Sequence, residues 1–196
     1  MLRSENIFDI IFLIGFVAGS VIRKVYTARC RGHKAARRHF TVSDTALITL
    51  AGVGMVAPLI YLFSSWMDCA DYDLPVWMGW TGTVAFAGAL VLLWRSHADL
   101  GANWSAILQI RPEHSLVTHG IYRYIRHPMY AAHLLWAIAQ ALLLGNWLAG
   151  WAFMVTFVPL YLLRVPREEE MMLEQFGQAY RDYMSRTGRM IPRFWR

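Results

Sequence analysis

Long apolar segments alternate with short polar ones along almost the whole chain. Five segments are rich in hydrophobic residues, at positions 7–22, 45–63, 76–94, 130–144 and 147–163. A helix needs about 20 apolar residues to cross roughly 30 Å of hydrocarbon, and the first three segments approach or reach that length. The last two are shorter and meet at Gly145 and Asn146, which is a turn signal. The pattern therefore predicts an all-α integral membrane helical bundle of about five transmembrane helices, in which the last two form a tight hairpin.

The polar tail after the fifth segment also keeps a helical spacing of apolar residues. From Glu168 onward, charged residues separate the members of this apolar set, which are Met171, Met172, Phe176, Tyr180, Tyr183 and Met184. Such spacing is typical of an amphipathic helix that lies along the membrane interface. We therefore expect an interfacial helix near the C-terminal end.

Length and composition agree with a single membrane domain. The chain has 196 residues, of which 57% are hydrophobic and only 16% are charged. This length suits one domain, and an ordinary soluble domain carries more charge. We expect residues 1–196 to form one membrane domain, with three spans in residues 1–94 and the functional region in residues 95–196.

The distribution of charge predicts how the bundle is oriented. Seven of the 19 basic residues lie between the first two apolar segments, namely Arg23, Lys24, Arg29, Arg31, Lys34, Arg37 and Arg38. Because such basic loops face the cytoplasm in multi-span proteins, the net charge of +6 indicates membrane topology and not nucleic acid binding. The loop at 64–75 carries three aspartates and no basic residue. Alternation then places the N-terminus outside, and the connection 95–128 and the tail from Arg164 on the cytoplasmic side.

Two apparent motifs have simpler structural explanations. The run from Gly52 to Ala57 matches the dinucleotide fingerprint G-x-G-x-x-A, but it lies inside an apolar segment and not between a strand and a helix. Small residues that let helices approach closely explain it better. Four histidines fall within twenty residues, at His114, His119, His127 and His133, yet none has a recognised ligand spacing with a cysteine or carboxylate. We expect no metal site.

A polar stretch at 114–130 precedes the fourth apolar segment and is the strongest candidate for chemistry. It contains histidines, arginines and tyrosines, and Pro128 stands where the first helical turn is expected. Anchoring of a helix end at the interface explains the arginines and tyrosines as well as a functional site does. Arg164 and Glu168 are four residues apart and share a helical face. Because ionisable groups at the end of an apolar span are costly, we favour a functional role for this pair.

The same residues resemble those of a known family. His114-Ser-Leu-Val117, Gly120-Ile-Tyr122, Arg126-His127-Pro128-Met-Tyr130, Glu168-Glu169, Phe176-Gly177 and Tyr180 resemble isoprenylcysteine carboxyl methyltransferases and related integral-membrane methyltransferases, including phospholipid methylators. Leu100-Gly101-Ala-Asn103-Trp104-Ser and Gln109 fit the same pattern. The likeness covers about residues 95–194 in the same order and spacing.

This resemblance implies that the C-terminal half binds S-adenosylmethionine at the cytoplasmic face. Carried over position by position, the cofactor residues are Gln109, His114, Ser115, Leu116, Val117, Tyr122, His127, Pro128, Met129, Tyr130 and Glu168. Arg164 matches the family's arginine beside the substrate and the reacting methyl group, and is the expected catalytic residue. The implied activity is transfer of a methyl group to a lipophilic acceptor, first of all the carboxylate of a C-terminal isoprenylcysteine.

The chemistry of these residue types is compatible with that activity. Glu168 suits the positive groups of S-adenosylmethionine, and a carboxylate acceptor needs no general base because it is already ionised at neutral pH. The expected partners are the lipid bilayer and a lipophilic substrate, with neither nucleic acid nor metal. Three alternatives stay open: a phospholipid amine methyltransferase, an NADPH-dependent membrane enzyme of the sterol-reductase kind, and a non-enzymatic lipid-binding scaffold.

Overall fold

Five long helices make up most of the protein. The computed structural model describes residues 6–30, 37–38, 42–101, 109–110 and 116–193. The long helices are α1 (Ile7–Cys30), α2 (Val42–Phe63), α3 (Val76–Leu100), α4 (Pro128–Leu143) and α5 (Trp147–Phe176). The shorter elements are η1 (Asp68–Ala70), η3 (Gly120–Arg123), α6 (Gln178–Arg186) and two paired antiparallel strands, β1 (Arg37–Arg38) and β2 (Gln109–Ile110).

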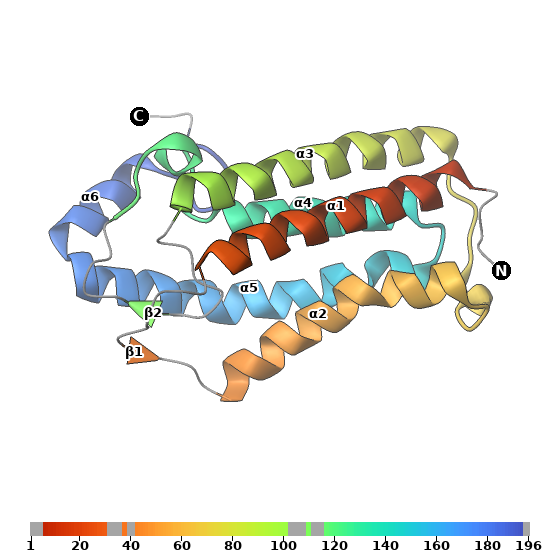
Figure 1. Ribbon diagram of the computed structural model, residues 1–196, viewed down its shortest axis with the longest axis horizontal. Helices are drawn as coiled ribbons and strands as arrows, with labels where there is room; N and C mark the ends of the chain where they lie inside the picture. The colour runs from red at the N-terminus through yellow and green to blue at the C-terminus, as the bar shows by residue number, and fades with distance from the viewer. Residues whose placement is uncertain (1–5, 31–36, 39–41, 102–108, 111–115, 194–196) are drawn as a thin grey trace.

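The long helices run side by side along the long axis of the molecule (Figure 1). Helices α1, α3 and α4 pack on one another, α2 packs along α5, and the α4–α5 hairpin joins the two groups. Aromatic rings fill the first group. Phe12 stacks on Phe86 with ring centroids 5.6 Å apart, and Phe86 meets Trp136 edge to face at 4.8 Å. All three rings are buried, and they belong to one apolar core that also includes Phe153 and Phe157 of α5.

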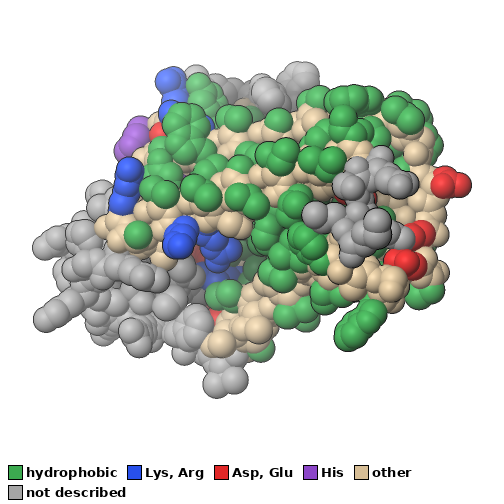
Figure 2. Space-filling model, turned by 45° about the vertical axis from the view of Figure 1, so that its right-hand side comes forward, with side chains coloured by type: hydrophobic (Ala, Val, Ile, Leu, Met, Phe, Trp, Pro, Cys, Tyr) green, Lys and Arg blue, Asp and Glu red, His purple; other side chains and the backbone are tan. Residues whose placement is uncertain are grey.

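The outer faces of the helices are apolar, as expected for a protein surrounded by lipid. Large hydrophobic side chains such as Val17, Val84 and Val155 are more than half exposed. A soluble protein rarely exposes such continuous apolar surface. Figure 2 shows hydrophobic side chains over the middle of one face, with basic groups gathered at one end and acidic groups at the other. Three of the described helices, α2, α3 and α5, are long and apolar enough to cross a membrane, and α4 is a shorter apolar helix.

The predicted all-α membrane bundle is confirmed, and each of the five predicted segments is a helix. The predicted hairpin turn is also present. Asn146 caps α5, because its Oδ1 accepts from the backbone N–H groups of Leu148 (3.0 Å) and Ala149 (2.8 Å). Its Nδ2 donates to the carbonyl of Met67 at 2.6 Å and to Asp71 Oδ1 at 2.7 Å. One side chain thus ends the turn and attaches it to the loop before α3.

Helix α5 is longer than the apolar segment 147–163. Helix α5 continues through the charged residues to Phe176, so Arg164 and Glu168 lie within one unbroken helix. Apolar composition marks the part of a helix that lipid surrounds, and the polar end that projects beyond it lacks this signal. The predicted interfacial helix is correspondingly divided. Gly177, with φ of +52°, separates the end of α5 from α6.

The Gly-x-Gly run of α2 acts as a helix contact through its second glycine. A Cβ atom added at Gly54 would contact Thr156 Oγ1 and lie 2.6 Å from the carbonyl oxygen of Ala152, both on α5. A Cβ atom at Gly52 would meet nothing within 4 Å. The run lies in the middle of α2, which agrees with close helix packing and not with a dinucleotide-binding turn.

A buried ion pair attaches the C-terminal segment to the bundle. Glu169 of α5 accepts from Arg126 Nε at 3.1 Å and from Arg189 Nη2 at 2.6 Å. Arg126 also donates to the backbone carbonyls of Met184 and Thr187. The side chains of Arg126 and Glu169 are only 8% and 5% exposed. Because Glu169 accepts from it, the pKa of Arg189 is raised and its guanidinium stays charged.

Backbone hydrogen bonds reinforce this attachment. The N–H groups of Arg126 and His127 donate to the carbonyls of Gly188 and Arg189, each at 2.8 Å. Tyr183 Oη donates to the carbonyl of Tyr122 at 2.7 Å. Burial raises the pKa of Tyr183 to about 12, so its hydroxyl keeps its proton at neutral pH. The segment before α4 is therefore held between α5 and the residues after α6.

We expect Gly54→Ala to destabilise the bundle, because the new methyl group collides with the α5 backbone. Overpacking of this kind costs about 1–3 kcal/mol. Gly52→Ala is the matched control in the same helix, and it should be neutral or gain up to about 1 kcal/mol of helix propensity. Thermal unfolding of the purified protein in detergent, followed by tryptophan fluorescence, measures both. Equal unfolding midpoints for the two variants would contradict the close α2–α5 contact.

We expect Glu169→Gln to loosen the C-terminal segment. It leaves the buried guanidinium of Arg126 without its carboxylate, and breaking a buried ion pair typically costs about 3–5 kcal/mol. The thermal unfolding midpoint should fall, and trypsin should cleave faster after Arg186 and Arg189. Glu170→Gln is the control, because Glu170 is the next residue and is exposed. Similar midpoints and cleavage rates in both variants would argue against the attachment.

Candidate active site

Three side chains converge on Glu168, the acidic residue at the centre of the candidate site. Its Oε1 accepts from Tyr130 Oη at 2.7 Å and from Arg164 Nε at 2.8 Å. Its Oε2 lies 3.7 Å from His127 Nδ1. The side chain of Glu168 is 18% exposed, compared with 5% for the neighbouring Glu169. Of the two adjacent carboxylates, Glu168 is the more accessible one.

Local sequence explains why these groups meet. Arg164 and Glu168 are one helical turn apart on α5, so their side chains lie on the same face. Pro128 occupies the first turn of α4, where its missing N–H costs no helical hydrogen bond. His127 therefore stands just outside the helix, and Tyr130 lies within its first turn. The two rings contact each other edge to face, with centroids 5.7 Å apart.

His127 lies between the two carboxylates of α5. Its Nε2 is 3.3 Å from Glu169 Oε1, while its Nδ1 faces Glu168 Oε2. Its ring is almost buried. This contact joins the accessible site around Glu168 to the buried ion pair of Glu169. The position of the imidazole is consequently fixed from both sides.

Arg164 connects the site to α2. Its side chain is only 10% exposed, and its guanidinium is close enough to interact electrostatically with buried Asp44 at the start of α2. Arg167, one turn from Arg164 on the same helix, lies 3.5 Å from Asp44 Oδ1. The start of α2 thus contributes a carboxylate to the surroundings of Arg164.

Tyr122 stands near this group but points mainly toward α3. Its ring is buried, and its Oη donates to the carbonyl of Ser96 at 3.3 Å. Burial, with Tyr183, Asp99 and Glu168 nearby, raises its pKa, so the phenol stays protonated. The backbone N–H of the neighbouring Ile121 donates to Asp99 Oδ2 at 2.7 Å. These contacts anchor η3 on the end of α3.

The structure brings together Arg164, Glu168, Tyr130 and His127 from the predicted set, with Pro128 fixing the start of α4. Met129 is partly buried and packs against the apolar core. Val117 is buried and Leu116 is half-buried in the segment before η3. His114 and Ser115 lie outside the described residues, and only the backbone of Gln109 is described, in β2. The cofactor-binding roles of all these residues stay predictions.

Three residues in or next to the site were not predicted from the sequence as site residues, namely Glu169, Asp44 and Arg189. Glu169 lies in one acidic run with Glu168 and Glu170, and the sequence alone does not show which of the three is buried. A signal for Asp44 was present, since a carboxylate at the start of an apolar segment is costly unless it has a partner. Arg189 carries no such signal, because it reaches Glu169 only through the fold of the C-terminal segment.

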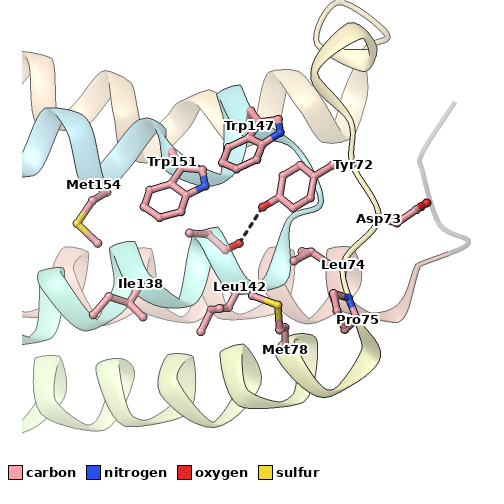
Figure 3. A pocket seen from close by; sticks show the side chains of 11 residues that line it. Tyr72, Asp73, Leu74, Pro75, Met78, Ile138, Leu142, Trp147, Trp151 and Met154 are labelled. Carbon is pink, nitrogen blue, oxygen red and sulfur yellow. Dashed lines mark hydrogen bonds between the residues drawn. The ribbon is translucent and has the colours of Figure 1, made fainter.

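A separate pocket lies at the opposite end of the α4–α5 hairpin. Its volume is about 280 Å³, and its lining includes Tyr72, Ile138, Leu142, Trp147, Trp151 and Met154 (Figure 3). Tyr72 Oη donates to the carbonyl of Ala141 at 3.5 Å across one side of it. None of the predicted site residues lines this pocket. We therefore place the candidate site at the Glu168 end of the bundle.

Comparison with known proteins identifies the region that carries this site. Residues 80–174 match the model of the isoprenylcysteine carboxyl methyltransferase (ICMT) family. The probable protein-S-isoprenylcysteine O-methyltransferase of Oryza sativa subsp. indica is 33% identical over 94 residues, which cover 47% of this chain and 49% of the rice protein. The protein-S-isoprenylcysteine O-methyltransferase of Tribolium castaneum is 36% identical over 94 residues, which cover 47% of this chain and 34% of the insect protein.

A solved structure extends the likeness beyond the matched sequence. The eukaryotic intramembrane Ras methyltransferase ICMT superposes with a TM-score of 0.54 and 27% identity, over 80% of this chain and 54% of that one. The chain spans half or less of the length of these two curated relatives. Arg126, His127, Tyr130, Arg164 and Glu168 all lie within the part that matches the family model. In sequence over residues 80–174, and in fold over most of the chain, this protein is similar to the isoprenylcysteine carboxyl methyltransferase family.

Proposed function

We propose that this protein transfers a methyl group from S-adenosylmethionine to the carboxylate of an isoprenylated cysteine. The single observation that carries the proposal is the position of Glu168 among Tyr130, Arg164 and His127, in the region that matches the methyltransferase family. We infer the acceptor from the similar proteins of rice and Tribolium castaneum, which are named as protein-S-isoprenylcysteine O-methyltransferases. The apolar faces of the bundle suit an acceptor that carries a lipid chain.

The described residues fit the methyl donor. S-adenosylmethionine has a positive sulfonium and a positive ammonium group, and Glu168 is the partly exposed carboxylate of the site. Tyr130 and Arg164 both hydrogen-bond to Oε1, whereas among the described residues Oε2 makes only the longer contact with His127. Oε2 can therefore accept hydrogen bonds from an ammonium group. Buried Val117 and half-buried Met129 are apolar and suit the adenine ring.

Arg164 is placed to orient the acceptor. A guanidinium has five N–H donors, so its bond to Glu168 through Nε does not use up its capacity to bind a carboxylate. Bidentate contacts between arginine and carboxylate fix direction as well as distance. Arg164 is hydrogen-bonded to Glu168. The residue that binds the methyl donor, Glu168, therefore also positions Arg164, the residue that binds the acceptor.

The reaction needs alignment and not acid–base chemistry. When bound, S-adenosylmethionine supplies an electrophilic methyl group, which passes to a carboxylate oxygen while the sulfur keeps the electron pair of the broken bond. The carboxylate is ionised at neutral pH, so no side chain has to remove a proton. The contribution of Arg164, Tyr130 and Glu168 is to hold the methyl donor and the acceptor carboxylate in a fixed geometry. The reaction between two molecules then takes place within one complex.

The site faces the cytoplasm in this proposal. Basic side chains gather at one end of the bundle and acidic ones at the other (Figure 2). The basic end is the cytoplasmic one in multi-span proteins. Arg23, Lys24 and Arg29 lie toward the C-terminal end of α1, whereas Asp68, Asp71 and Asp73 lie between α2 and α3. Soluble S-adenosylmethionine then reaches the site from the cytosol.

We expect labelled methyl transfer from S-adenosylmethionine to N-acetyl-S-farnesylcysteine by the purified protein in lipid nanodiscs. The same assay includes a phospholipid amine, phosphatidylethanolamine, as an alternative acceptor. Titration calorimetry with S-adenosylmethionine and with NADPH runs in parallel. Binding of NADPH without binding of S-adenosylmethionine would overturn the proposal, and so would methylation of the phospholipid alone.

We expect Glu168→Gln and Arg164→Gln to fail in different ways. Loss of the carboxylate should weaken S-adenosylmethionine binding by about 10-fold or more, since hydrogen bonds to charged groups contribute about 1.5–3 kcal/mol. Loss of the guanidinium should leave donor binding within a few-fold and lower kcat by about 100-fold, of the order expected when one charge-stabilising donor is removed. Calorimetry and single-turnover methyl transfer measure the two effects.

Glu170→Gln is the matched control for both variants, because Glu170 is exposed and lies in the same acidic run. It should match the parent protein in donor binding and in kcat. If Glu168→Gln and Arg164→Gln also match the parent protein, the assigned roles of these residues are wrong.

A further inference from the structure

The pocket at the end of the bundle away from Glu168 has no role in the proposed reaction. Its volume is about 280 Å³. The loop before α3 and the first residues of α3 form one wall, and the last turns of α4 and the first turns of α5 form the others. Among the described residues that line it, only Asp73 is charged. We call this pocket the hairpin groove.

The hairpin groove lies parallel to the helices and opens toward lipid. Its side chains follow the axis of the hairpin, from Tyr72 and Trp147 at one end to Met154 at the other (Figure 3). Trp147 and Met154 are seven residues apart, which is about 10 Å along α5. Ile138, Trp147 and Trp151 are between 38% and 59% exposed, so the groove is open at its side. An acyl chain of the bilayer lies in the same direction as a spanning helix, and the apolar lining suits it.

The fold holds the walls of the groove in place. The backbone N–H of Tyr72 donates to the carbonyl of Gly145 at 2.8 Å, and the Tyr72 ring lies against the ring of Trp147, with centroids 4.6 Å apart. A Cβ atom at Gly145 would lie 2.6 Å from the carbonyl oxygen of Tyr72, so the loop lies directly on the turn. The bond from Asn146 to Asp71 reinforces this contact. A pocket that is already formed loses little free energy to ordering when a ligand binds.

The charge at the Tyr72 end of the groove selects between lipid headgroups. Asp73 is exposed at this end, with its carboxylate turned outward (Figure 3). Residues 64–80 contain three aspartates and neither lysine nor arginine. A headgroup with net negative charge is repelled there, whereas an ammonium group is attracted. The exposed ring of Trp147, beside the ring of Tyr72, adds an aromatic face on which an ammonium group can lie.

We propose that the hairpin groove binds one zwitterionic phospholipid. One acyl chain lies between Ile138 of α4 and Met154 of α5, and the ammonium headgroup lies beyond Tyr72, near Asp73. The inference goes beyond methyl transfer, because the groove shares no residue with the site around Glu168. A lipid bound here contacts the start of α3 and both helices of the hairpin, so its binding stabilises the folded bundle.

Ordinary lipid contact makes a different prediction. Any apolar helix face in a bilayer is covered by lipid, and this contact depends neither on the headgroup nor on one hollow of the surface. A second copy of this protein is another occupant, which would cover the groove in a dimer. Headgroup preference, filling of the groove and oligomeric state separate these three cases.

The experiment counts the phospholipids that stay bound to the purified full-length protein in a non-ionic detergent, by native mass spectrometry. Phosphatidylcholine and phosphatidylglycerol with the same acyl chains are compared, because the ammonium group of phosphatidylcholine can accept no further methyl group. One phosphatidylcholine should bind per protein chain, about 5-fold more tightly than phosphatidylglycerol. The thermal unfolding midpoint should rise with the concentration of phosphatidylcholine. Equal binding of the two lipids would overturn the inference.

Met154→Trp fills the groove with a larger side chain and should abolish binding of this phosphatidylcholine. Val155→Trp is the matched control, since Val155 is the next residue of α5, is 67% exposed and does not line the groove. It should retain the lipid as the parent protein does. Retention of the lipid by both variants would contradict the proposed position. If Met154→Trp instead turns a dimer into a monomer in light scattering, with lipid binding unchanged, the groove is an interface between copies and the inference is wrong.

Asp73→Asn tests the headgroup without disturbing the packing, because the side chain is exposed. It should lose most of the preference for phosphatidylcholine over phosphatidylglycerol. Glu170→Gln removes an exposed carboxylate from the other end of the bundle and should keep the preference of the parent protein. An undiminished preference in Asp73→Asn would overturn the assignment of the headgroup. These measurements need no methyl donor, so their outcome is independent of the proposed reaction.

Discussion

Two adjacent carboxylates on the polar C-terminal part of α5 hold together the candidate site and the segments around it. Neighbouring residues of a helix point about 100° apart, so Glu168 and Glu169 face different surroundings. Glu169 is nearly buried and holds Arg126 and Arg189, and through them the segments before α4 and after α6. Glu168 is more exposed and meets Tyr130 and Arg164. His127 contacts both carboxylates, so the packing of the fold and the geometry of the site depend on one imidazole.

Much of the fold could be predicted from the sequence because lipid imposes a simple rule on composition. Each apolar run had to be a helix, since a membrane offers no other partner for backbone groups. This rule applies only to the part of the chain that lipid surrounds. It therefore could not show how far α5 continues beyond its apolar part, which it does without a break to Phe176. The division at Gly177 depended on one glycine with a positive φ angle, which the spacing of apolar residues did not reveal.

The site was predictable to the extent that its members are close in sequence. Arg164 and Glu168 are one turn apart, and His127 and Tyr130 flank a proline that starts a helix, so their local geometry followed from elementary helix rules. That the two pairs meet required the α4–α5 hairpin to bring the start of one helix beside the end of the other. Asp44 and Arg189 come from remote parts of the chain, and no local spacing connects them with Glu168 or Glu169. Residues joined only by tertiary structure were the ones that sequence reasoning missed.

The α4–α5 hairpin is fixed at both of its ends, and this divides the bundle into a stiff part and an adaptable part. At one end Asn146 binds the loop before α3, and at the other Glu169 binds the segment that starts α4. Neither helix can slide along the other without breaking one of these attachments. Within the described residues, helices α1 and α2 have no extensive contact with each other. For the proposed reaction, a bundle built in this way allows α1 and α2 to move apart and admit acceptors with lipid chains of different length, while the contact between Tyr130 of α4 and Glu168 of α5 is kept.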